Sequence, residues 1–309
     1  MQICICRISV KIKIGDVTKI RTGKLDANAA DENGQYPFFT CSKEPLKINT
    51  YSYDCECVLV AGNGDLNVKY YNGKFDAYQR TYIIEDDSDG LLFMPYLYFF
   101  MESYIDELRK QSIGGVIKYI KLKNLTDALI ELPSIEVQRK IVNIISKSKE
   151  IISKKENEFE LLDELVRARF VEMFGEIDDC DRWKIKIWNE VVTIQNGRDY
   201  KKVLVNDGGY PVVGTGGEIA RASGYLCPEN TIVVGRKGSI NNPMLMKEKF
   251  WNVDTAFGVI PNSDYLHYQY FYYFCKFYNF MKLNKATTLP STTKADLLKI
   301  APLLQMGGK

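Results

Sequence analysis

The chain has 309 residues, of which 46% are hydrophobic and 26% charged, and its formal net charge is +2. This composition is that of an ordinary globular protein long enough for two domains. It contains no run of about 18 apolar residues and no signal-peptide start, so a cytoplasmic location is expected. The small net charge leaves nucleic acid binding open, because a local basic patch decides it.

The first module is predicted over residues 1–133. Alternating and β-branched apolar residues predict strands at 8–14 and 57–60. An apolar helix is predicted from Pro95 to Leu108, with the proline in its first turn. Glycine-containing sequences that favour turns separate these elements, at Asn33-Gly34, Gly62-Asn63-Gly64 and Asn72-Gly73.

A single long helix is predicted over residues 134–175. Neither glycine nor proline occurs from Glu136 to Phe174, Ser134 can begin the helix, and Gly175 can end it. At 1.5 Å per residue it is roughly 60 Å long. An apolar stripe with a seven-residue repeat predicts coiled-coil-type packing through Ile145, Ile152, Phe159, Val166 and Met173.

The partner of this stripe is left open by the sequence. A companion heptad row is partly polar, which favours an antiparallel or multi-helix contact over one parallel seam; it consists of Ser148, Lys155, Leu162 and Arg169. An ordinary core helix is the alternative, although forty unbroken residues are long for one.

The second module, residues 176–309, repeats the first at a constant shift of 174 residues. Gly23 corresponds to Gly197 (197 − 23 = 174), and Gly64 corresponds to Gly238. The shift also matches Tyr36-Pro37 to Tyr210-Pro211 and Asn67 to Asn241. A fixed shift over roughly 85 residues indicates a duplicated domain. A strand is therefore predicted at 231–234 and an aromatic helix at 268–280.

Both modules are predicted to be α+β, each a curled mixed β-sheet with short helices, and the long coiled-coil-type helix joins them. Two similar modules on a rigid spacer favour a bivalent reader, which binds through both modules at once.

The sequence gives little indication of a catalytic site. His267 is the single histidine and corresponds to Phe93 in the first module, so histidine-based catalysis shared by the modules is excluded. Cys55 and Cys57 fall on Glu229 and Thr231 at the same shift, so no shared metal site depends on them. Phosphate-binding and methyl-donor motifs are not found either. We therefore predict no catalytic residue, no metal site and no cofactor.

Binding residues are expected mainly on two loops that follow an apolar strand at equivalent places in the copies. Glycines there let the backbone approach a ligand, and the polar side chains can read DNA base edges or hold phosphates. The candidates are Lys43, Asn63, Asn67, Lys69 and Arg80 in the first module, and Arg236, Lys237, Ser239, Asn241 and Lys294 in the second. For any single residue, the alternative is a plain hairpin turn with solvated charges.

Three stretches carry a family resemblance. The helix start Glu131-Leu132-Pro133-Ser134-Ile135-Glu136-Val137-Gln138-Arg139 combines a proline turn with Glu-x-Gln-Arg. The helix end from Leu162 to Gly175 and the repeated Tyr-Pro pairs are the other two. With the order of parts, they make nearly the whole chain similar to the DNA sequence-specificity subunit of type I restriction–modification systems. That family's plan is a target recognition domain, a long helix, a second target recognition domain and a second helix.

The resemblance implies a non-catalytic subunit. Each target recognition domain would bind one half of a split target in double-stranded DNA, and the helix would set the spacing between the halves. Two methyltransferase (modification) subunits would dock on it, carrying their own S-adenosylmethionine, and a restriction translocase subunit would join them.

The chain departs from this plan because it ends at Lys309, before a second helix. The resemblance then implies that the stripe on the long helix pairs with a helix of another chain, by self-association for example, or that the chain is poorly soluble alone. One alternative function is a truncated, non-productive specificity protein or recombination cassette that binds the methyltransferase without full target recognition. Another is an enzyme with its own nuclease or methyltransferase activity.

Overall fold

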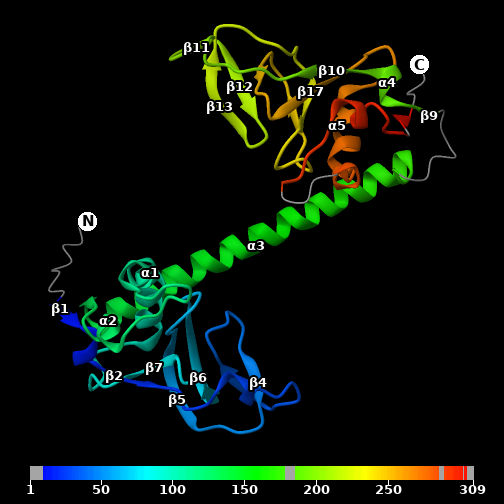
Figure 1. Cartoon of the computed structure of the whole chain (residues 1–309). Coiled ribbons are helices and arrows are strands. Elements are labelled where there is room, and N and C mark those ends of the chain that lie inside the picture. Colours follow the sequence, from blue (N-terminus) through cyan, green and yellow to red (C-terminus); the bar gives the residue numbers. More distant parts are fainter. Residues whose placement is uncertain (1–9, 178–184, 285–288, 302, 305–309) are drawn as a thin grey trace. The chain divides into compact units, whose positions relative to one another are not determined.

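The computed structural model describes residues 10–177, 185–284, 289–301 and 303–304 (Figure 1). The chain forms two compact units, residues 1–156 and 157–309, which divide within the long helix. Among the described residues, none of the helices combines the length and the apolar character that crossing a bilayer requires.

The first unit is built on a six-stranded sheet with the strand order β2-β7-β5-β6-β3-β4. All neighbours are antiparallel except β3 and β6, which are parallel. The strands are β2 (Thr18–Thr22), β3 (Tyr36–Phe39), β4 (Leu46–Ile48), β5 (Tyr53–Ala61), β6 (Val68–Ala77) and β7 (Thr81–Asp86). A separate antiparallel pair joins β1 (Val10–Lys13) to β8 (Leu129–Leu132). The helical elements are η1 (Ile14–Asp16), η2 (Ala27–Ala29), α1 (Met94–Gln111) and α2 (Leu122–Thr126).

Strand β5 lies at the centre because both of its faces are buried. Alternate residues point to opposite sides of a strand. Val58 and Val60 pack with helix α1, whose buried residues Met94, Leu97, Met101 and Leu108 follow helical spacing. Cys57 and Leu59 pack on the other side, in a cluster that contains Phe39, Tyr53 and Phe75. The predicted strand at 57–60 and the predicted helix at 95–108 are thus confirmed.

Two predictions in the first unit are corrected or limited. The turn expected at Asn72-Gly73 is wrong, because both residues lie inside β6 and Gly73 is paired with Cys55 of β5. Continuous pairing between the long strands overrides the local turn signal. Of the strand expected at 8–14, residues 10–13 form β1, Ile14 begins η1, and residues 8 and 9 lie outside the described residues.

The second unit repeats this plan with its sheet in two parts. The order β10-β17-β14-β15 corresponds to β2-β7-β5-β6, and β12 pairs in parallel with β16 as β3 does with β6. The first sheet consists of β10 (Val192–Asn196), β14 (Thr231–Gly235), β15 (Met244–Met246) and β17 (Ala256–Pro261). The second consists of β11 (Leu204–Val205), β12 (Tyr210–Gly214), β13 (Gly217–Ala222) and β16 (Trp251–Asn252). A short pair joins β9 (Ile185–Lys186) to β18 (Leu303–Leu304).

Aromatic residues fill the core of the second unit. Trp188, fully buried, packs edge-on against Phe271 and Phe280. The helical elements are α4 (Trp188–Val191), α5 (Tyr268–Phe277), η3 (Phe280–Leu283) and α6 (Lys294–Leu297). The aromatic helix predicted to reach residue 280 therefore ends three residues earlier, because Tyr278 takes an extended conformation.

The duplication keeps one glycine at a place where two backbones come too close for a side chain. A Cβ atom on Gly23 would lie 2.1 Å from the carbonyl oxygen of Ala77. A Cβ atom on Gly197 would lie 1.8 Å from the carbonyl oxygen of Val253. The matched glycines of the sequence therefore mark the same close approach in both units.

Helix α3 (Ile135–Phe174) confirms the predicted long helix with both of its ends (Figure 1). The N–H of Val137 donates to the carbonyl of Ser134, and Gly175 follows the last helical residue with a φ of 86°. The stripe is only partly covered by the chain. Ile152 (57% exposed), Phe159 (67%) and Met173 (48%) face solvent, whereas Ile145 and Val166 are half-buried.

Candidate nucleic-acid interface

In the first unit, the loop after the central strand is held by its own backbone. This glycine loop, residues 61–68, lies against residues 117–120, which we name the clamp segment. The N–H of Gly64 donates to the carbonyl of Lys118 (2.9 Å), and the carbonyl of Gly62 accepts from the N–H of Ile120 (2.9 Å). The N–H of Gly62 donates to the carbonyl of Arg80 (2.8 Å).

The second unit builds the same arrangement from different residues. Its glycine loop is 235–241 and its clamp segment is 289–292. The N–H of Gly238 donates to the carbonyl of Pro290 (2.9 Å), and the carbonyl of Arg236 accepts from the N–H of Thr292 (3.0 Å). The N–H of Arg236 donates to the carbonyl of Thr255 (2.8 Å). Gly64 and Gly238 both have positive φ angles, 69° and 80°, which a residue with a side chain rarely adopts.

The side chains between these fixed points differ in the two units. Asn63 forms a β-bridge with Tyr119, and Lys237 forms the corresponding bridge with Ser291. Such a bridge uses backbone groups, so the side chain of the loop residue is not needed to hold the loop. The geometry therefore presents a variable side chain from a constant backbone.

The first-unit candidates line two hollows in the surface. Asn63 and Arg80 share one of about 410 Å³ with Ile117 and Tyr119. The other, of about 300 Å³, is lined by residues that include Lys43, Asn67, Glu102 and Arg109. The hollows are neighbours through Cys41, whose thiol lies 3.6 Å from the carbonyl oxygen of Arg80 and whose carbonyl accepts from Asn67. Four of the five predicted residues are thus brought into one region.

Asn67 and Lys69 are engaged inside the protein. The Asn67 amide donates to the carbonyls of Cys41 (2.8 Å) and Asp65 (2.9 Å) and accepts from the Lys69 ammonium. Burial lowers the pKa of Lys69 from its ordinary value. These contacts hold the β3–β4 turn, which carries Lys43, against the glycine loop. The predicted DNA contacts of Asn67 and Lys69 stay predictions.

In the second unit, Arg236, Lys237 and Ser239 are exposed together on the glycine loop. The Arg236 guanidinium donates to the carbonyl of Asp254 (3.3 Å) and lies 5.9 Å from the centre of the Phe257 ring. Backbone and ring contacts of this kind orient the positive charge without neutralising it. The three residues therefore form a cationic, polar surface suited to a polyanion.

Asn241 and Lys294 are held by other parts of the second unit. The Asn241 side chain accepts from the N–H of Phe280 (2.7 Å) and donates to Asn279 (3.2 Å). The Lys294 ammonium donates to the carbonyl of Ile194 (2.8 Å). Their role as DNA contacts also stays a prediction, because both side chains already brace the protein.

The clamp segments were not predicted from sequence. The residues that they join by hydrogen bonds are more than 50 positions apart, and Lys118 corresponds to Pro290 at a shift of 172 (290 − 118) rather than 174. The second unit has two residues fewer between its glycine loop and its clamp segment, so the constant shift of 174 residues does not hold there. The Gly114-Gly115 pair, which favours a turn, was the one local signal of a special loop before the first clamp segment.

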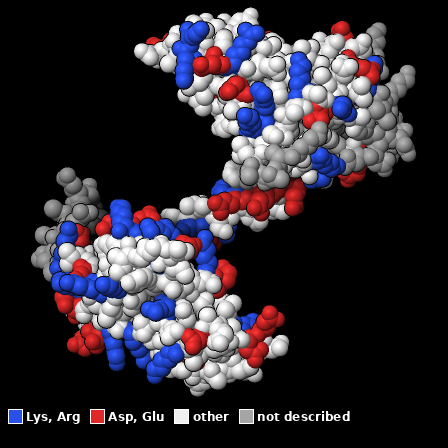
Figure 2. Space-filling model, viewed as in Figure 1, with Lys and Arg blue, Asp and Glu red and all other residues white. Residues whose placement is uncertain are grey.

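Charges are distributed unevenly over the surface. Figure 2 shows acidic side chains gathered over the second half of α3, whereas basic side chains are spread over the faces of both units. The acidic stretch contains the exposed residues Glu156, Glu158, Glu160, Asp163 and Glu164. Repulsion by these carboxylates disfavours DNA along that part of α3. The candidate interface therefore belongs to the two loop regions.

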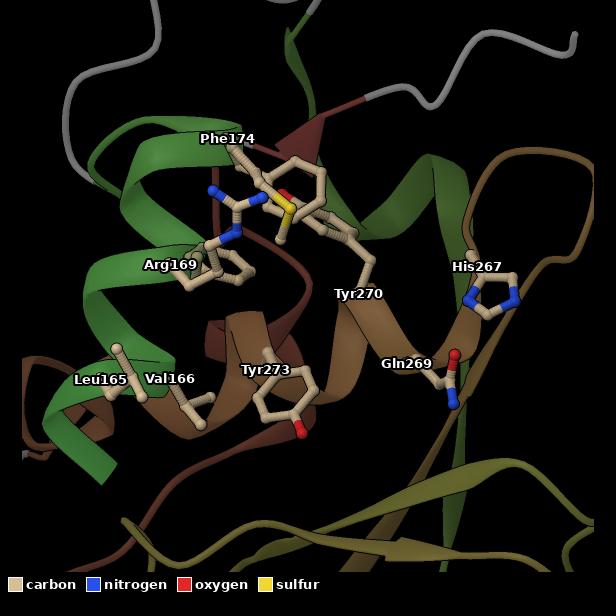
Figure 3. A pocket seen from close by; sticks show the side chains of 10 residues that line it. Leu165, Val166, Arg169, Phe174, His267, Gln269, Tyr270 and Tyr273 are labelled. Atoms are coloured by element: carbon tan, nitrogen blue, oxygen red, sulfur yellow. The ribbon is translucent and has the colours of Figure 1, made fainter. Parts of the chain in front are cut away.

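An apolar hollow of about 450 Å³ lies within the second unit, between the end of α3 and the start of α5. Figure 3 shows Leu165, Val166 and Arg169 of α3 on one side and Tyr270 and Tyr273 of α5 on the other. Val166 and Met173 of the predicted stripe line it. The hollow is a place for apolar packing, and polar chemistry is scarce in it.

His267 belongs to the second unit, and the cysteines Cys55 and Cys57 belong to the first. His267 is the exposed N-cap residue of α5, and its ring stacks on Tyr268. Cys55 and Cys57 are free thiols on β5. Within the described ranges, no group of three or more His, Cys, Asp or Glu residues could hold a metal ion.

Two buried thiols, Cys227 and Cys275, give a chemical test of the core packing in the second unit. We expect iodoacetamide at pH 8 to leave Cys227 and Cys275 unmodified in the folded chain, because burial raises the pKa of both thiols, that of Cys227 to about 12. Mass mapping of peptides before and after denaturation measures this. Rapid labelling of Cys227 in the native chain would contradict the core packing around it.

The chain has relatives among known proteins. A family model described as "Type I restriction modification DNA specificity domain" matches residues 9–161 and 181–301. The type I restriction enzyme EcoDI specificity subunit of Escherichia coli is 45% identical over 123 residues, which are 40% of this chain and 27% of the relative. The type I restriction enzyme MjaVIII specificity subunit of Methanocaldococcus jannaschii is 23% identical over 218 residues, 62% of this chain and 50% of the relative. The match therefore spans half or less of either relative.

A solved structure has the same fold. It is the S subunit of a type I restriction–modification system from M. genitalium, with a TM-score of 0.70 and 15% sequence identity. The similarity covers 99% of this chain and 87% of that one. The predicted α+β fold of two similar domains joined by a long helix is thus confirmed.

Proposed function

This chain belongs to the family of type I restriction modification DNA specificity domains, and from that membership we propose that it recognises a DNA sequence for a type I restriction–modification complex. Each unit reads one half of a bipartite target, and α3 sets the spacing between the halves. The observation that carries the proposal is the duplicated clamp. It presents Asn63 in one unit and Lys237 in the other from equivalent backbone positions, with Arg80 beside the first and Arg236 beside the second.

These side chains match what DNA offers. Arginine, lysine and asparagine donate to acceptors on base edges in the major groove, and the same cations bind phosphates. Unlike residues on like backbones support two units that read different half-sites. Sequence discrimination then comes from the loops, while the sheets and α3 serve as the frame.

The chain acts without catalytic residues or a cofactor of its own in this proposal. Methylation is performed by methyltransferase subunits that carry S-adenosylmethionine, and cleavage by a restriction translocase subunit. The exposed stripe residues Ile152, Phe159 and Met173 support a helical partner along α3, from another chain or a second copy.

A genetic experiment tests the proposal. Methylated adenines are mapped across the genome of the source organism with and without the gene, and again after complementation. Loss of one split motif on deletion and its return on complementation are expected. An unchanged methylation pattern would contradict the proposal and would favour a protein that binds the methyltransferase without productive DNA recognition.

Joint replacement of Arg236 and Lys237 by alanine tests the second unit directly. We expect target binding to weaken by roughly 1–3 kcal/mol for each lost base contact, and by less if the side chains touch phosphates only. Affinity measured across a salt series separates the two cases, because loss of phosphate contacts lowers the salt dependence.

The matched control removes the same charge elsewhere. Replacement of Lys154 and Lys155 on α3 by alanine also lowers the net charge by two but leaves both loops intact. Equal losses for the two double variants would remove the glycine loop from the proposed interface and would leave a general charge effect.

A further inference from the structure

Each clamp segment places one exposed aliphatic side chain at the same position. Ile117 precedes Lys118, whose carbonyl accepts from Gly64, and Leu289 precedes Pro290, whose carbonyl accepts from Gly238. Ile117 is 64% exposed and Leu289 is 54% exposed. Single exposed apolar residues are common on protein surfaces and have no meaning by themselves. Here the feature recurs at an equivalent backbone position in two segments whose following residues all differ.

The position is fixed by the backbone and lies beside the polar candidates. Ile117 lines the hollow that also contains Asn63, Arg80 and Tyr119. In the first unit, two backbone hydrogen bonds between Ile113 and Tyr119 (3.0 and 2.9 Å) close the loop that carries Ile117. In the second unit, Leu289 is two residues before Ser291, which bridges to Lys237, as Ile117 is two residues before Tyr119. Each unit therefore sets one aliphatic group next to its polar loop.

The surroundings decide what kind of ligand fits this aliphatic group. A protein partner would be expected to use a contiguous apolar patch. In the first unit, other apolar side chains are also exposed near Ile117, namely those of Ile113, Val116 and Tyr119. At the shift of 172 residues these correspond to Lys285, Thr288 and Ser291, so the wider apolar patch does not recur. What both sites share is one aliphatic side chain next to cations, Arg80 and Lys118 in the first unit and Arg236 and Lys237 in the second. A base pair in the major groove offers donors, acceptors and one apolar group, the C5-methyl of thymine. The recurring aliphatic group beside polar loop residues complements that pattern.

We propose that Ile117 and Leu289 each contact the C5-methyl group of a thymine in the major groove, one in each half of the target. The proposal rests on the proposed function and adds an apolar contact to it. In each half-site, the glycine loop binds the polar part of the base edges, and the clamp segment binds the methyl group.

The experiment begins with the full chain and a library of random duplex DNA. The wild-type chain is expected to enrich a split motif with a preferred thymine in each half. Ile117→Ser should remove the thymine preference in one half only, and Leu289→Ser in the other half only. Deoxyuridine placed at either preferred thymine then removes only the methyl group. It should weaken wild-type binding about fourfold, which corresponds to about 0.8 kcal/mol for one buried methylene-sized group. The serine variant of the same half should not respond.

Leu91→Ser is the matched control, because Leu91 is also 64% exposed in the first unit and lies outside the clamp. It should leave both halves of the motif unchanged. A wild-type chain that enriches no sequence would overturn both the proposed function and this inference. An enriched motif in which both serine variants keep the thymine preference, or in which deoxyuridine binds as well as thymine, would overturn this inference alone.

Discussion

Replacement of Gln138 by alanine is expected to destabilise the first unit by roughly 3 kcal/mol, because a fully buried amide loses three hydrogen bonds. Its side-chain oxygen accepts from the N–H of Phe93 (2.8 Å), and its nitrogen donates to the carbonyls of Leu91 and Pro133 (2.8 Å each). Alanine leaves one N–H and two carbonyls without these partners. The start of α1 and the start of α3 then lose the hydrogen bonds that join them.

Hydrogen exchange of the peptides around residues 91–97 measures this local loss, which a global unfolding curve of a two-unit chain would blur. Gln138→Glu should be similarly harmful, since a carboxylate cannot donate to the two carbonyls. Asn143→Ala is the control, because Asn143 is an exposed position on the same helix. Equal exchange in Gln138→Ala and Asn143→Ala would contradict the role assigned to Gln138.

Gly197→Ala is expected to destabilise the second unit by about 3 kcal/mol, at the upper end of the cost of overpacking. The added Cβ would lie 1.8 Å from the carbonyl oxygen of Val253 and 2.8 Å from that of Asn252. Both neighbours are backbone atoms, so no flexible side chain can move aside. Strand β10 must shift away from the turn between β16 and β17.

Gly224→Ala is the matched control, because no atom lies within 4 Å of its added Cβ. Hydrogen exchange of peptides from β10 and β17, measured at increasing temperature, compares the stability of the two variants. The equivalent change in the first unit, Gly23→Ala, should weaken β2 in the same way. A Gly197→Ala chain as stable as Gly224→Ala would show that the backbone there yields more easily than its geometry indicates.

The parts of the fold that could be predicted from sequence are those with strong local or repeated signals. The unbroken stretch before Gly175 predicted α3 with both ends, and the constant shift paired Gly64 with Gly238, which share a positive φ angle. Helix periodicity and glycine spacing are properties of neighbouring residues. These signals do not depend on contacts with distant parts of the chain.

Other features depended on partners far away in the sequence. The turn predicted at Asn72-Gly73 does not form, because β6 pairs continuously with β5 there. Helix α5 ends at Phe277, and the aromatic residue Phe280 beyond it packs on Trp188 instead of extending the helix. Neither partner is adjacent to the residues concerned. Local propensity is a weak guide where tertiary contacts of this kind compete with it.

The candidate site shows the same limit. Polar residue types and glycines predicted the two loops, but sequence could not reveal that Lys294 donates to Ile194, a hundred residues away, or that Asn241 holds Phe280. Nor could it reveal the clamp segments, which join the loops through main-chain atoms. Side-chain identity carries no information about such bonds.

Because backbone hydrogen bonds hold the two glycine loops, their side chains are free to vary during evolution. Mutations at positions 63, 65, 237 and 239 alter what the loop presents, yet they leave the hydrogen bonds of Gly62, Gly64, Arg236 and Gly238 in place. New preferences can therefore arise by single substitutions with little loss of stability. The same tolerance makes these four positions the natural ones to randomise when a changed specificity is wanted.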